Sequence, residues 1–211
     1  MPSPTNSVDA GDPFWSLIRG RRSVRRYAPR PVPDDVVQQL LEAAHWAPSA
    51  HNRQPWRFVI VEAGERRQRL ATGMADRWQV DLLADGADPE AVQRRAAISV
   101  RRVAGSPLVI VPCLELALLD SYPDPARQRA EWQMGVQSVA LACQNLLLAA
   151  HHVGLVACWM CAPIFCPELV VETLALPDSW QPQALLTLGY PPDDPPTTKP
   201  RNPLAQHVLR C

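Results

Sequence analysis

The segment that most constrains the fold is residues 107–114, PLVIVPCL, which is apolar from end to end. A strand with one face in water alternates apolar and polar side chains, so an unbroken apolar run of this length indicates a strand covered on both faces. We therefore expect it at the centre of a sheet with other elements packed above and below. Hydrophobic residues make up 47% of the 211, enough to bury such a core.

The elements around this strand are predicted from periodicity and from boundary residues. Apolar residues at helical spacing after an aspartate or proline indicate helices, and short β-branched runs indicate strands. Since strands and helices mix without strict βαβ repetition, the sequence predicts a layered α+β or α/β domain. Helices are expected over 13–20, from 33 to the proline at 48, over 65–83, over 126–152 and from 167 onward, and strands over 57–62, 107–114, 155–160 and 184–190.

Three stretches are predicted to lack regular structure. We expect one domain over 1–211, with a flexible N-terminus at 1–12 and a proline-rich C-terminal arm at 191–211. The polar stretch 84–95, ADGADPEAVQRR, is predicted to be a mobile connection.

Charge and composition disfavour several classes of protein. Lysine plus arginine and aspartate plus glutamate both total 21, so no net field attracts a nucleic acid or an anionic membrane. The longest apolar run, 139–150, is too short for a membrane span, and the polar start lacks a secretory signal, so we expect a cytoplasmic protein. The six cysteines lie mostly in apolar surroundings, which is typical of reduced, buried thiols.

Two polar segments offer groups for a ligand. Residues 21–27, RRSVRRY, alternate cations with a hydroxyl after a short helix, and guanidinium groups in such a loop can converge on a phosphate. Residues 48–56, PSAHNRQPW, offer the hydroxyl and amide groups of Ser49, Asn52 and Gln54, which can read a heteroaromatic edge. Alone, the first is equally well a solvated basic loop and the second an ordinary polar loop.

A third segment lies in the tail. Lys199, the single lysine of the chain, is one residue from Arg201 in a stretch stiffened by prolines. The two cations can point outward from a preorganised backbone, although a frayed terminus has the same composition.

Together the three segments resemble the motifs of the nitroreductase superfamily of flavin enzymes. RRSVRRY is similar to its R-x-S-x-[KR]-x-[FY] motif, PSAHNRQPW to its P-S-x-x-N-x-Q-P-W motif, and the tail KPRNPL to its C-terminal K-x-R. They occur in the same order, and the similarity in pattern covers 14–204. The resemblance implies an α+β domain of three layers, with a central mixed sheet flanked by helices, and an intertwined homodimer with FMN at the subunit interface.

The resemblance also implies roles for individual residues. Residues 21–23 would bind the phosphate and ribityl chain of FMN, and Arg25 would stand near N1 and O2, where a cation stabilises the reduced ring. Ser49 and Asn52 would reach the flavin of the partner subunit, and residues 159–162 would lie along the ring, with Cys161-Ala162 where the family commonly has Glu-Gly. The implied cofactor-binding set is Arg21, Arg22, Ser23, Arg25, Ser49, Asn52, Gln54, Trp159, Met160, Cys161, Ala162, Lys199 and Arg201.

The implied activity is hydride transfer through flavin N5, with no catalytic side chain and no metal. The donor would be NADH, NADPH or a reduced flavin, and the acceptor an electron-poor conjugated small molecule. Residues 74–86, 121–127 and 158–182 further resemble the C-terminal flavin domain of the bifunctional enzyme of coenzyme F-420 biosynthesis, which implies the dehydro precursor of that coenzyme as acceptor. The candidates for binding its anionic groups are Arg26, Arg101, Arg102 and Arg127, each of which is equally an ordinary surface arginine.

Two alternatives remain open at this point. The protein could be a non-catalytic flavin- or deazaflavin-binding partner of a glutamate ligase. It could also be a thiol-based metal or redox module built on Cys158, Cys161 and Cys166, although no second ligand pair follows at metal-site spacing.

Overall fold

A central antiparallel sheet organises the structure, a computed structural model that describes residues 12–194 and 200–211. Four strands lie side by side in the order β1 (Trp56–Ile60), β2 (Leu108–Glu115), β5 (Leu185–Gly189) and β3 (Val156–Met160), and the short β4 (Trp180–Pro182) also pairs with β2. Every pair of these strands is antiparallel. The one parallel pairing among the described residues is an isolated bridge between Ser23 and Ala157, so the expected mixed sheet is mixed only there.

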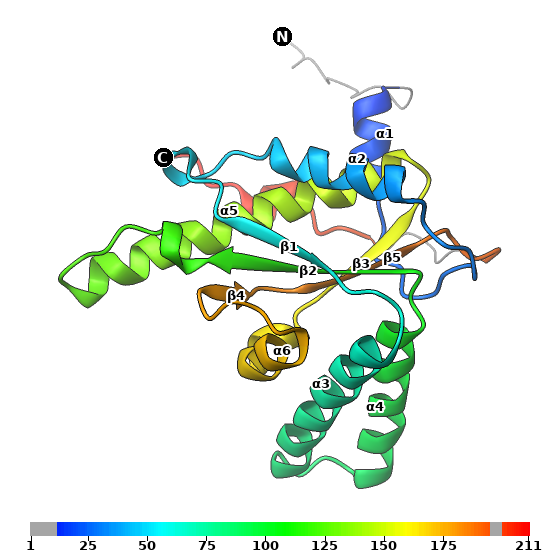
Figure 1. The fold of residues 1–211 in the computed structure, drawn as a ribbon. Helices are drawn as coiled ribbons and strands as arrows, with labels where there is room; N and C mark the ends of the chain where they lie inside the picture. The colour runs from blue at the N-terminus through cyan, green and yellow to red at the C-terminus, as the bar shows by residue number, and fades with distance from the viewer. Residues whose placement is uncertain (1–11, 195–199) are drawn as a thin grey trace.

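The apolar strand lies where the sequence predicts it. All eight residues of β2 are buried, and the strand runs between β1 and β5 (Figure 1). Its residues alternate between two cores, as the period of a strand requires. Ile110 packs in the cluster on the side of α2 and α5, whereas Val109 packs in the cluster on the side of α3 and α6.

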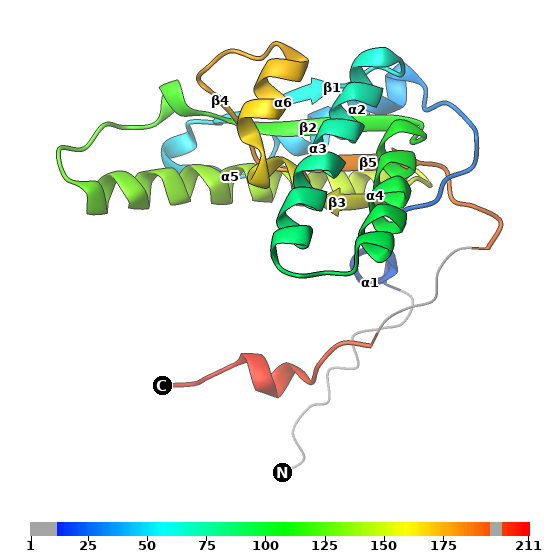
Figure 2. The same ribbon diagram turned by 90° about the horizontal axis from the view of Figure 1, so that it is seen from below.

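Helices cover both faces of the sheet and complete the three layers (Figures 1 and 2). The long α5 and α2 lie on one face with α1 beside them, and α3, α4 and α6 lie on the other. The helix bounds are α1 Pro13–Gly20, α2 Asp34–His45, α3 Glu65–Ala84, α4 Pro89–Ala104, α5 Pro125–His152 and α6 Pro167–Leu174. Short 3-10 helices are η1 Ala50–Asn52, η2 Leu116–Leu118, η3 Ala162–Phe165 and η4 Leu204–His207. These bounds confirm the predicted α+β architecture.

The prediction of a mobile stretch at 84–95 is wrong for its second half. Asp88 caps α4 by accepting the N–H of Ala91 at 2.7 Å, and Pro89 occupies the first turn. The helix then buries Val92 against its neighbours, and α4 packs along α3. The polar composition concealed a helix whose start signal, aspartate before proline, is the same one that correctly predicts α1.

The two ends of the chain lie outside the three layers or outside the described residues. The predicted flexible N-terminus lies outside the described residues except for Asp12, which caps α1. Residues 200–211 are exposed throughout and extend away from the three layers (Figure 2). In the described part of the chain, no helix is both long enough and apolar enough to cross a membrane.

Candidate functional site

The 21–27 loop lies along the start of β3 and is fixed there by backbone and hydroxyl contacts. Ser23 forms the bridge with Ala157, and the Val24 N–H donates to the Ala157 carbonyl at 2.9 Å. Val24 is buried, whereas its neighbours Ser23 and Arg25 are exposed. The Tyr27 hydroxyl lies 2.8 Å from the Val24 carbonyl and 2.7 Å from the Thr187 hydroxyl on β5. The loop therefore presents alternate side chains outward from a backbone held by the sheet.

A cluster of cations forms where this loop meets the ends of α1 and α5 and the C-terminal arm. Burial lowers the pKa of Arg21, and the nearby guanidinium groups of Arg201 and Arg22 lower it further. Burial also lowers the pKa of His151 at the end of α5, with Arg22 and Arg21 as additional causes. Among the described residues, no carboxylate is a cause of either pKa shift. Guanidinium groups in such a cluster can bind a phosphate, whose oxygens match their donors.

Gly20 allows the close approach of α1 and α5 at this cluster. A Cβ atom on Gly20 would clash with Nε2 of His151, so a larger residue there would require the imidazole to move. The end of α1 therefore lies directly against the His151 side chain of α5.

The segment 158–162 continues from the same cluster. Burial raises the pKa of the Cys158 thiol, and Arg25 and Arg102 oppose the shift, so both cations lie near the start of this segment. The Trp159 indole N–H donates to Cys161 Sγ at 3.2 Å, and Ala162 begins η3. The structure thus brings together residues 21–25, 158–162 and Arg201, while Lys199 lies outside the described residues.

The 49–54 loop has an unusual backbone. His51, Asn52 and Gln54 have φ values of 53°, 52° and 51°, in the left-handed region that non-glycine residues seldom adopt. Two contacts brace the loop: the Gln54 N–H donates to Ser49 Oγ at 3.0 Å, and the Ala50 N–H donates to Ser138 Oγ of α5 at 3.2 Å. Backbone strain held in place by the surrounding structure is typical of ligand-binding segments.

This loop is not joined to the cation cluster within one chain. Trp56, just after the loop, pairs with Leu114 on β2, whereas Ala157 lies level with Leu108, since both are opposite Leu188. Leu114 and Leu108 are six residues apart along β2, or about 20 Å. The two motifs also adjoin opposite edge strands of the β1-β2-β5-β3 path.

Helix α5 gives an independent measure of the same separation. Ser138 contacts the 49–54 loop, and His151 adjoins Gly20 at the cation cluster. Thirteen residues of α-helix span about 20 Å. Ser49, Asn52 and Gln54 are therefore remote, in a single subunit, from the predicted cofactor residues around Arg21 and Ala157.

Four arginines line a surface hollow of about 380 Å³, here called the arginine hollow. Arg25, Arg26, Arg101 and Arg102 surround it, together with Tyr27, Ile98 and Gly105. Among the described residues, Arg26 alone of the four has an acidic partner, Asp194 at 3.0 Å. Three of the four arginines considered for a substrate anion are thus adjacent to Arg25. The fourth, Arg127, instead pairs with Asp124 at the start of α5.

A larger hollow, about 660 Å³, lies elsewhere. Its lining includes Asp120 and Trp132 beside the first half of α5, and none of the predicted cofactor residues. A site shared between two subunits would be open in one chain, so a hollow of this size does not by itself mark the cofactor site.

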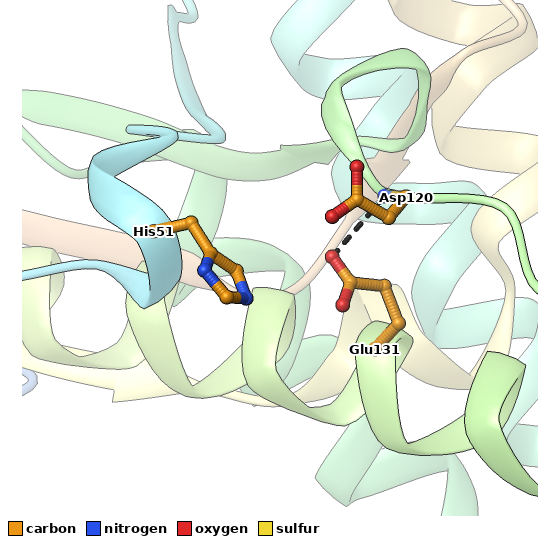
Figure 3. Close-up of side chains that lie close together, drawn as sticks. All are labelled: His51, Asp120 and Glu131. Atoms are coloured by element: carbon orange, nitrogen blue, oxygen red, sulfur yellow. Dashed lines mark hydrogen bonds between the residues drawn. The ribbon is translucent and has the colours of Figure 1, made fainter.

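The cysteines behave as expected for reduced thiols. All six are free, and four of them are buried. Among the described residues, the one group of three side chains close enough to share a metal ion is His51, Asp120 and Glu131, which includes no cysteine (Figure 3). Sequence reasoning missed this group because its members come from three separate segments. The only available signal was an acidic residue, Glu131, at a buried position of a helix.

Comparisons with known proteins agree with this fold. A model described as "Nitroreductase family" matches residues 18–190. A candidate NADH dehydrogenase/NAD(P)H nitroreductase of Methanothermobacter thermautotrophicus is 29% identical over 184 residues, covering 85% of this chain and 78% of the relative. The 5,6-dimethylbenzimidazole synthase of Rhodospirillum rubrum is 30% identical over 188 residues, covering 88% and 85%.

A solved structure extends the likeness to three dimensions. The crystal structure of a candidate nitroreductase from Desulfovibrio desulfuricans, in complex with FMN, superimposes with a TM-score of 0.72 at 28% identity and covers 94% of this chain and 96% of its own. With the family model matching most of the chain and both relatives aligned over most of their lengths, the chain belongs to the Nitroreductase family.

Proposed function

We propose that the protein is an FMN-dependent oxidoreductase that passes hydride from NADH, NADPH or a reduced flavin to an electron-poor conjugated small molecule. The observation that carries the proposal is the cluster of Arg21, Arg22 and Arg201 beside β3 in a chain of the Nitroreductase family. The names of relatives support the donor, and the FMN in a solved relative supports the cofactor.

The residues present fit the phosphate of FMN. Arg21 is half buried among like charges, and an anion would replace that repulsion with charge-assisted hydrogen bonds. Arg201 brings the C-terminal arm to the same point, and Lys199 is proposed to join it. Ser23 lies next to these arginines on the 21–27 loop and offers its hydroxyl to the phosphate.

The other end of the cofactor is proposed to lie along residues 159–162, with Arg25 at its charged edge. Bound FMN supplies hydride transfer at N5, so the protein needs no acid or base side chain for that transfer. Arg25 stabilises negative charge at N1 and O2, and Trp159 to Ala162 orient the ring and exclude water.

We further propose that the active form is a homodimer in which each site takes the 49–54 loop from the partner subunit. The support is geometric, since the two motifs lie about 20 Å apart in one chain. The exposed arm at 200–211 also carries apolar side chains with nothing from its own chain over them, such as Leu204 and Leu209, which are 76% and 87% exposed.

The test of the proposed function is the anaerobic behaviour of the purified protein. It should carry a yellow chromophore that chromatography after release identifies as FMN. NADH or NADPH should bleach it, and an electron-poor acceptor should restore the colour through repeated cycles. A chromophore that survives every donor unchanged would instead indicate a non-catalytic flavin- or deazaflavin-binding protein, and absence of FMN binding would refute the proposed oxidoreductase.

The arginine hollow favours one narrower acceptor. The dehydro precursor of coenzyme F-420 carries a phosphodiester and a carboxylate, and Arg101 and Arg102 could bind such anions beside Arg25. Helix α4 also gains from these two cations at its C-terminal end, so their presence alone does not require a ligand. We therefore offer this substrate as a proposal that depends on the kinetic test below.

A dedicated enzyme should favour the precursor over a nitroaromatic compound by at least about a hundredfold in kcat/KM. Arg102→Gln should lower the value for the precursor and leave the value for the nitroaromatic unchanged. Arg95→Gln, on the same helix but outside the hollow, is the matched control. Equal efficiencies with both acceptors would leave only the general oxidoreductase.

A further inference from the structure

His51, Asp120 and Glu131 bring one imidazole and two carboxylates together beside the first half of α5 (Figure 3). They come from η1, from the connection after η2, and from α5 itself. One ligand atom from each residue lies within 4.8 Å of those of the other two. The imidazole ring extends toward the carboxylates in the close-up, so the three donors face a common space.

Glu131 is the residue that calls for a partner. Its side chain is 2% exposed, and its Oε1 accepts the backbone N–H of Asp120 at 3.2 Å. Its Oε2 is buried with no hydrogen-bond partner, and it is the one buried side-chain oxygen or nitrogen atom in that condition among the described residues. A buried carboxylate oxygen without a donor or cation costs folding free energy, so native structures seldom leave one.

The charges of the cluster also leave room for a cation. Asp120 pairs with Arg53, which balances one of the two carboxylates. His51 forms no ion pair with either carboxylate, so the charge of Glu131 has no counterion in the described structure.

We propose that His51, Asp120 and Glu131 bind a divalent metal ion of the Mn²⁺ or Fe²⁺ type. Two carboxylates and one imidazole, without thiolate, are a donor set that such ions accept, with water completing six-coordination. Bonds of about 2.1 to 2.3 Å put two ligands of one octahedral ion about 3 to 4.5 Å apart. The observed separations, all within 4.8 Å, are close to this range.

The proposed metal site is accessible from solvent, and a bound ion would link two segments of the chain. Asp120 lines the hollow of about 660 Å³, and His51 is exposed, so an ion can enter from solvent. A bound ion would tie the strained 49–54 loop to α5 through His51, in addition to the bond between Ala50 and Ser138. The three ligands are not themselves predicted cofactor residues, although His51 lies between Ser49 and Asn52 on the same loop.

The experiment is a titration of chelator-treated protein with Mn²⁺, in which the electron paramagnetic resonance signal of the free ion reports binding. Wild-type protein should bind one ion per chain, with or without added FMN, and its Tm should rise with Mn²⁺. Glu131→Gln keeps the shape and the acceptor for Asp120 but removes the charge, and it should weaken binding at least tenfold. His51→Gly removes the imidazole at a φ that suits glycine and should do the same.

Two further variants sharpen the result. Arg53→Ala removes the cation that competes for Asp120, so it should tighten Mn²⁺ binding. His152→Ala, an exposed histidine at the far end of α5, should leave binding unchanged. The proposal is overturned if wild-type protein has no saturable site, or if folded Glu131→Gln and His51→Gly bind Mn²⁺ as tightly as wild type.

Discussion

Arg21 is half buried near groups of its own charge, an arrangement that opposes folding. Local stability is often given up in this way where function requires it. The motif RRSVRRY contains four arginines, which the fold separates into two groups. Arg21 and Arg22 lie near His151, and Arg21 also lies near Arg201, whereas Arg25 and Arg26 line the arginine hollow.

The first residue-scale prediction concerns affinity for the cofactor. Charge-assisted hydrogen bonds contribute about 1.5 to 3 kcal/mol each, so Arg21→Ala or Arg201→Ala should weaken FMN binding roughly tenfold to a hundredfold. Titration of apo-protein with FMN measures the effect, and Arg210→Ala on the same arm is the control. Wild-type affinity in both variants would mean that the phosphate binds elsewhere.

The second concerns acid stability. Because the pKa of His151 is lowered in the folded state, the unfolded chain binds its proton more readily, and stability falls as the pH drops below the usual value of 6.5. Above that value His151 is neutral in both states and contributes no pH dependence. His151→Gln should therefore lose less Tm than wild type between neutral and mildly acidic pH. FMN should also reduce the loss, because its phosphate would offset Arg21 and Arg22; parallel curves for wild type and variant would contradict the assignment.

At the scale of elements, α4 combines an aspartate cap with an apolar face that buries Val92, Ala96 and Val103. Asp88→Ala removes the cap for the Ala91 N–H and should cost about 1 kcal/mol of unfolding free energy, measured by denaturant titration. Asp85→Ala, in the same connection just after α3, should have a smaller effect. Equal losses in the two variants would show that the cap is not what fixes the start of α4.

The elements differ in how far the sequence determines them. The buried strand β2 and the long α5 follow from apolar runs, and their predicted bounds agree with the structure to within one residue at each end. Strand β4 has only three residues and no apolar run, so its pairing with β2 depends on the fold around it. Residues 84–95 have the polar composition of a loop, so the sequence predicts a mobile connection where the capped helix α4 begins.

At the scale of the whole molecule, the two flavin motifs are separate surfaces of one chain. A mixture of an inactive Arg21→Ala chain with an inactive Asn52→Ala chain should therefore recover part of the activity, because shared sites pair an intact half from each. Each variant mixed with itself is the control. If the mixture of the two variants recovers no more activity than the controls, each chain forms its site alone.

The candidate site illustrates what sequence motifs leave out. The motifs predict which residues bind the cofactor, but the separation of Ser49 from Arg21 appears only once the strand register is known. The cluster of His51, Asp120 and Glu131 has no motif, since 80 positions of sequence separate its first and last members. The feature that draws attention to it is a buried oxygen, Glu131 Oε2, which has no hydrogen-bond partner in the described structure.

The distance of about 20 Å between the two motif loops also has a thermodynamic consequence. If one cofactor contacts loops from two chains, association of the chains and binding of the cofactor become reciprocal: each strengthens the other by the same factor. Dilution should then release the cofactor, and removal of the cofactor should loosen the dimer. Measured affinity for FMN would depend on protein concentration, so the fraction of sites occupied by FMN would rise with the amount of protein.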